Sequence, residues 1–243
     1  HTALVHFRAA KNVSSKTVHC LLQAADLIKK IYAAAESPSV EGEDDLDRDP
    51  GPTVSLSKSE MEQMAENLRS ELDLALSDPL DALNIRVFGV DVLVPAEVQG
   101  LSKQCWAHLL GAGKTEWSAM SVPLDTHATR WVVLRNDRHN IERQRVTYLE
   151  ECWHILLGHR LTRIAKVANA YGRTYDSSEE HDAYYLAAAT LLPSEAVVQA
   201  VQQTRSVRSI ADQYGVSTDL VEYRIKRLGL WKTHRGISVT LAD

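Results

Sequence analysis

The stretch that decides the fold is Tyr148-Leu149-Glu150-Glu151-Cys152-Trp153-His154-Ile155-Leu156-Leu157-Gly158-His159. Its apolar residues recur at helical spacing, which predicts a helix that ends near Gly158. Side chains four residues apart share one helix face, so Glu150 and His154 project together, with Glu151 about 100° further round. This is the geometry of the H-E-x-x-H motif, in which two side chains hold a metal ion and the intervening Glu acts as the base.

Two positions of this stretch, Glu150 and His159, affect how it could hold a metal ion. The first motif position is Glu150, where H-E-x-x-H has a histidine. His159 lies five residues beyond His154, on a different face of a continuous helix. We therefore expect His159 to approach a metal only if the chain turns at Gly158.

A second helix is predicted at residues 179–193, where an alanine-rich apolar run follows an acidic first turn. Carboxylates in a first turn suit the helix dipole, which is a purely structural explanation. The functional alternative is that one of them, Glu180 or Asp182, is a third metal ligand. The small alanine side chains would let this helix pack closely against the first.

Together the two segments resemble the ImmA/IrrE family of metallo-endopeptidases, whose usual pattern is H-E-x-x-H followed by E-x-E-A-x-x-F-A-A-x-L-L-x-P. The second part reads here Glu180-x-Asp182-Ala183-x-x-Leu186-Ala187-Ala188-x-Thr190-Leu191-x-Pro193. The resemblance extends from about Leu56 to Gly229. It includes Arg143-Gln144-Arg145-Val146-Thr147, which is similar to the family's R-x-x-F-T lead-in.

The resemblance implies an α+β fold: a mainly helical, zincin-like peptidase core, a small antiparallel β-sheet and a helix-turn-helix-like tail. It divides the chain into an N-terminal helix with an acidic linker (1–55), a metallopeptidase domain (56–200) and the tail (201–243). In this division residues 37–55 are the acidic linker, because they are rich in carboxylates and poor in apolar residues.

The site that the resemblance implies has Glu150, His154 and Glu180 as metal ligands and Glu151 as the general base. Asp182 is the reserve candidate for the third ligand. The ion is divalent, with zinc the first choice. Because a carboxylate replaces an imidazole, manganese and iron are alternatives, since oxygen-rich sites favour harder ions.

The resemblance also implies a protein substrate, a helix-turn-helix repressor in phage, mobile-element or stress regulation. One alternative is a pseudo-peptidase that binds a partner without cutting it. Another is DNA binding by the locally basic tail, with Arg224, Lys226 and Arg227 as phosphate contacts. Acidic residues interleave with these cations, which argues against the second alternative.

Composition restricts the class of protein and the cellular compartment that we expect. The chain has 243 residues, a formal net charge of −5 and ordinary globular composition, which argues against a generally basic nucleic-acid binder. Three scattered cysteines predict a reducing compartment and no disulfide framework. No apolar run approaches the ~18 residues that a spanning helix needs, and no signal peptide is visible. We therefore expect a cytoplasmic protein without membrane contact.

Flanking elements follow from local patterns. Ser57 and Glu60 form a possible capping box. Gly111 to Thr115 imitates a phosphate loop but lacks its first glycine, so we interpret it as a turn. The remaining predictions are helices at 14–35, 101–110 and 194–201, strands at 89–95, 117–122 and 130–134, and a helix-turn-helix at 207–230.

Overall fold

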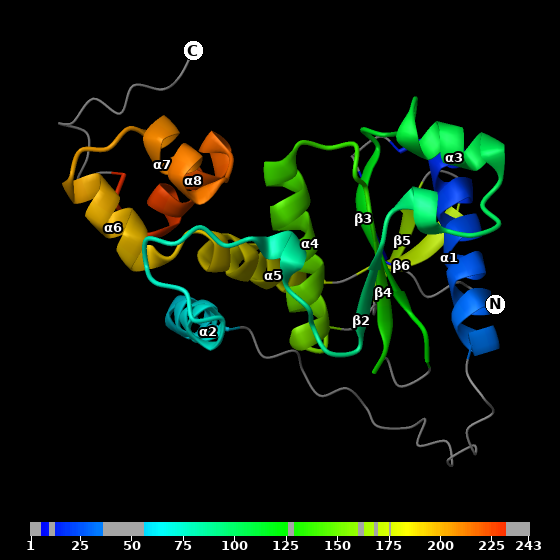
Figure 1. Cartoon of the computed structure of the whole chain (residues 1–243), viewed down its shortest axis with the longest axis horizontal. Helices are drawn as coiled ribbons and strands as arrows, with labels where there is room; N and C mark the ends of the chain where they lie inside the picture. The colour runs from blue at the N-terminus through cyan, green and yellow to red at the C-terminus, as the bar shows by residue number, and fades with distance from the viewer. Residues whose placement is uncertain are drawn as a thin grey trace. The chain divides into compact units, whose positions relative to one another are not determined.

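The structure is a computed structural model (Figure 1). It describes residues 6–9, 13–35, 56–125, 129–159, 163–167, 170–174 and 176–231, and the predicted acidic linker lies outside these ranges. The chain forms two compact units: His1–Leu56, Phe88–Asn136 and Arg160–Asp176 make the first, and Ser57–Val87, Asp137–His159 and Ser177–Asp243 the second. Each unit combines three separate segments of the chain. The predicted division into consecutive stretches at residues 55 and 200 stays a prediction.

The first unit contains a four-stranded sheet in the order β1-β3-β4-β2. β1 (His6–Ala9) and β4 (Trp131–Arg135) both pair antiparallel with β3 (Trp117–Pro123). β2 (Val90–Leu93) pairs parallel with β4. The predicted strands are thus confirmed, but the predicted small antiparallel sheet contains one parallel pair, β2 with β4. β2 and β4 are not joined by a hairpin, because a helix and β3 intervene, and this longer connection permits parallel pairing.

Two helices pack beside this sheet, α1 (Ser15–Ala35) and α3 (Lys103–Leu110). The apolar face of α1 forms a core with α3, β3 and β4 in which Leu21, Ile28, Leu109 and Trp117 are fully buried. The unit also contains η2 (Pro95–Glu97) and a two-stranded antiparallel sheet of β5 (Arg163–Val167) and β6 (Ala170–Thr174). The segment after α3 is a turn, as predicted, and not a phosphate loop.

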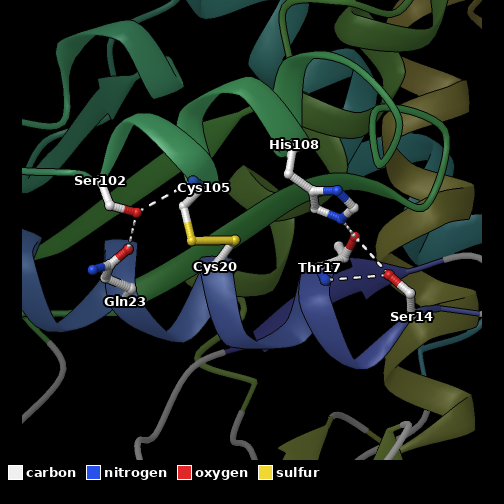
Figure 2. The surroundings of a disulfide bond; sticks show 7 residues. All are labelled: Ser14, Thr17, Cys20, Gln23, Ser102, Cys105 and His108. Carbon is white, nitrogen blue, oxygen red and sulfur yellow. Dashed lines mark hydrogen bonds between the residues drawn. A yellow bond between two sulfur atoms is a disulfide. The ribbon is translucent and has the colours of Figure 1, made fainter.

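A disulfide joins Cys20 on α1 to Cys105 on α3 (Figure 2). Beside it, the Thr17 hydroxyl and the His108 Nε2 atom are 2.8 Å apart, which links the same two helices again. The prediction that the cysteines form no disulfide framework did not anticipate this bond. The partners are 85 residues apart in sequence, so their pairing follows from how α1 packs on α3 and not from any local spacing. The cysteines accordingly give no support to the predicted reducing compartment.

The second unit is helical. It consists of α2 (Lys58–Glu71), η1 (Ala82–Asn84), α4 (Ile141–Leu156), α5 (Ser177–Leu191), α6 (Ser194–Gln202), α7 (Val207–Tyr214) and α8 (Thr218–Arg227). α4 and α2 both pack on α5, and the α5 alanines are fully buried, as the predicted close packing requires. The Ser57 capping box at the start of α2 is also confirmed.

The tail forms the predicted helix-turn-helix. α7 ends at Gly215, whose φ of 62° lies in the left-handed region that glycine adopts readily. Ser217 then caps α8 through a hydrogen bond from the Leu220 amide to its hydroxyl. The α+β class with mostly helical content is thereby confirmed, and the zincin-like character of the core stays a prediction. Within the described ranges, every helix is too short or too polar to cross a lipid bilayer.

Candidate metal centre

Helix α4 supplies two of the predicted ligands and the predicted base. The helix begins at an Asn140 cap, whose side chain accepts a hydrogen bond from the Arg143 amide. Glu150 and His154 are 2% and 0% exposed, and Glu151 is 1% exposed. These three polar side chains are therefore buried, whereas on a solvent-facing helix they would be exposed.

The first turn of α5 brings the third predicted ligand to the same place. An oxygen of Glu180 lies 4.0 Å from Nε2 of His154. Glu150, His154 and Glu180 each offer one ligand atom, and these three atoms lie within 4.8 Å of one another. Atoms bound to one ion at about 2.1 Å are at most about 4.2 Å apart, so small side-chain rotations would close the site.

The residue types of this region suit a divalent cation. Burying a carboxylate is costly unless positive charge or hydrogen bonds compensate it. Glu150 and Glu151 are adjacent and buried on α4, and Glu179 and Asp182 are buried on α5. Because carboxylate oxygens and an imidazole nitrogen are ordinary ligands of divalent metals, these side chains fit such an ion.

The reserve ligand Asp182 has a different position. It is 6% exposed on α5, but it does not belong to the group of converging ligand atoms. Among the described residues, Glu180 is the acidic side chain of α5 that meets Glu150 and His154. The identity of the ligands that hold an ion stays a prediction.

His159 is the additional residue that the fold brings to this region. The chain turns at Gly158, and Nδ1 of His159 lies 2.9 Å from Nδ1 of His154. Burial lowers the pKa of His159, against the opposing effect of the nearby carboxylates on α5. This position meets the condition that the sequence sets for His159, a turn at Gly158. The contact of His159 with the predicted ligand His154 has no local signature in the sequence.

The three basic residues predicted to contact DNA differ in their contacts within the protein. Arg224 is completely buried, and its guanidinium donates to Glu62 and to the Leu192 carbonyl. It is therefore unsuited to contact phosphates. Lys226 pairs with Glu222, and it also lies over the Trp231 ring. Arg227 lies over the ring of Tyr223.

The packed helices α4 and α5 bring buried carboxylates together with an imidazole. Residues 113–226 match the peptidase family described as the IrrE N-terminal-like domain, and this part of the chain belongs to that family. The match contains both helices of the candidate site and most of the tail. The predicted resemblance to the ImmA/IrrE family is confirmed over these residues. No curated protein and no solved structure matches the chain.

Proposed function

We propose that this protein is a metal-dependent endopeptidase in which Glu150, His154 and Glu180 hold one divalent ion. The observation that carries the proposal is the convergence of three ligand atoms within 4.8 Å, from two helices that are distant in sequence. The family of residues 113–226 supports it independently, because its members are classed as peptidases.

In the proposed reaction the metal ion and Glu151 have different roles. A divalent ion held by Glu150, His154 and Glu180 would polarise the scissile carbonyl and lower the pKa of a bound water towards ~7. Glu151 accepts the proton of the attacking water and passes it to the leaving amine, as the glutamate of H-E-x-x-H does. Glu151 is 1% exposed, so this carboxylate is kept out of bulk water.

The carboxylate at position 150 changes the properties of the site. With Glu150 and Glu180 as ligands, two negative charges surround the ion beside the neutral imidazole of His154. The ion then retains less net positive charge, so it acidifies water less than an ion held by two histidines and one glutamate. Zinc remains our first choice, and manganese and iron gain affinity relative to a histidine-rich site.

The substrate we propose is a protein. The resemblance to ImmA/IrrE peptidases supports a helix-turn-helix repressor as the target. The competing function is a pseudo-peptidase that binds such a partner without cleavage. The two differ in one respect that can be measured directly, which is the formation of new chain termini.

A peptide library derived from a whole proteome provides that measurement, with mass spectrometry of new termini after incubation with zinc or manganese. We expect cleavage by the wild type, and a loss of about 10²–10⁴-fold in Glu151→Gln, with the bound metal retained. Glu142→Gln on the same helix is the matched control and should cleave normally. Equal cleavage by Glu151→Gln and wild type refutes the assigned base, and metal binding without any cleavage favours the pseudo-peptidase.

A further inference from the structure

The two nitrogens of the His154 ring face different partners. Nε2 faces Glu180, whose carboxylate oxygen is 4.0 Å away. Nδ1 faces the imidazole of His159, with 2.9 Å between the two Nδ1 atoms. The ring centroids are 5.0 Å apart and the rings meet edge to face, at 66°. The contact is therefore a directed hydrogen bond between the two rings and not a stack.

The backbone fixes His159 in this position. The His159 amide donates to the His154 carbonyl over 3.0 Å, and the Gly158 amide donates to the Ile155 carbonyl over 3.0 Å. With Gly158 at a φ of 65°, these two bonds make a Schellman motif at the end of α4. The same pair of histidines is thus joined twice, once through the backbone and once through the rings.

The ring contact determines where the protons are. A hydrogen bond between two Nδ1 atoms needs one donor and one acceptor, and a neutral imidazole carries a proton on only one nitrogen. A nitrogen that binds a metal must offer its lone pair. If Nε2 of His154 binds the ion, its proton is on Nδ1, and Nδ1 of His159 must be the acceptor.

We infer that His159 is a positioning residue, which holds His154 in the tautomer and orientation that present Nε2 to the ion. The inference rests on the proposed metal site. Metal-binding histidines commonly donate their second ring N–H to a carboxylate, a carbonyl or water, and such partners raise metal affinity. Here a second imidazole takes that role.

A neutral acceptor suits the charge of this site. Glu150, Glu151 and Glu180 already bring three carboxyl groups to the region around the ion. Another carboxylate behind His154 would add like-charge repulsion, and the cost would grow with burial. The imidazole of His159 orients the ligand without adding negative charge.

The test is the zinc affinity of His159 variants, measured by competition with a chromophoric chelator. The Oδ1 atom of an asparagine can occupy the place of Nδ1, whereas leucine has a similar shape and no acceptor. We expect His159→Leu to weaken zinc binding by about 10–100-fold, and His159→Asn to stay much closer to the wild type. His19→Leu, at an exposed histidine of α1, is the control and should leave the affinity unchanged.

The outcomes separate this inference from the proposed function. A wild type without zinc affinity overturns both. Zinc binding that is equal in wild type and His159→Leu overturns the inference alone. If His159→Leu does not fold, ¹⁵N NMR of the zinc-bound wild type decides: a proton on Nδ1 of His154 and none on Nδ1 of His159 supports the inference, and the reverse overturns it.

Discussion

The guanidinium of Arg224 on α8 donates two hydrogen bonds, of 2.8 and 2.9 Å, to the carboxylate of Glu62 on α2. Tyr185 on α5 donates its hydroxyl to the same carboxylate, and Arg224 also donates to the carbonyl of Leu192. Because Arg224 is completely buried, this network ties the tail to the helices that carry the candidate metal site.

Breaking this buried pair should destabilise the second unit strongly. Glu62→Leu leaves the Arg224 charge buried without its partner, and we expect a loss of about 3–5 kcal/mol in the free energy of unfolding. The matched control is Glu222→Leu, which removes the exposed pair with Lys226 on the same helix. It should cost less than about 1 kcal/mol. If chemical denaturation gives equal losses of unfolding free energy for the two variants, the buried pair contributes no more to stability than the exposed one.

The same carboxylate predicts a dependence of stability on pH. Burial raises the pKa of Glu62, but the hydrogen bonds and charge of Arg224 and the Tyr185 hydroxyl outweigh it, so the pKa lies below the ordinary 4.5. The stabilisation is therefore complete above pH 4.5 and is lost as the pH falls through the lower folded-state pKa. Thermal unfolding of wild type and Glu62→Gln should show converging melting temperatures below pH 4.5. A constant difference between the two down to pH 2 contradicts this.

The disulfide predicts a specific thiol count. Denatured protein without reductant should show one reactive thiol, Cys152, and with reductant all three cysteines should react. In the native protein Cys152 should react very slowly, because burial raises its pKa to about 12. Three reactive thiols in the denatured, unreduced protein would show that Cys20 and Cys105 are not bonded.

Loss of that bond should also weaken the first unit. A cross-link that closes a long loop typically contributes about 2–4 kcal/mol, so Cys105→Ser should lower the unfolding free energy by that amount. The matched control is Cys152→Ser in the second unit, measured with and without reductant. Added reductant should destabilise Cys152→Ser and have no effect on Cys105→Ser. If reductant lowers the unfolding free energy of both variants, the predicted role of the Cys20–Cys105 bond is contradicted.

The backbone conformation of Gly158 places His159 beside the candidate metal site. Its φ of 65° is costly for residues with a Cβ, although an added Cβ would meet nothing within 4 Å. We expect Gly158→Ala to cost roughly 1 kcal/mol and to weaken zinc binding by displacing His159. Gly158→Asn should do less harm, because asparagine tolerates this conformation better. Identical zinc affinity in all three proteins would show that the turn does not support the site.

The sequence predicts most of what depends on local order. Helical spacing places Glu150 above His154, an acidic first turn marks Glu180, and the glycine at position 158 marks the end of α4. The features it does not predict are set by tertiary packing. Parallel pairing of β2 with β4 and the bond between Cys20 and Cys105 have no local signature.

Arg224 illustrates the same limit. On a basic helix its charge suggests a phosphate contact, because sequence alone does not tell which face of α8 is covered. The structure shows that this face of α8 is buried: Arg224 lies over the Tyr185 ring of α5, and Glu62 of α2 supplies the counter-charge. A lone buried arginine in a tail is therefore recognisable only once its partner, far away in the sequence, is known.

The most direct test of the proposed metal centre is anomalous diffraction from a crystal soaked in zinc. The account predicts one strong peak within ~2.0–2.2 Å of a carboxylate oxygen of Glu150, Nε2 of His154 and a carboxylate oxygen of Glu180. No peak at this position at saturating zinc, or a peak that one of these three side chains does not reach, would contradict it.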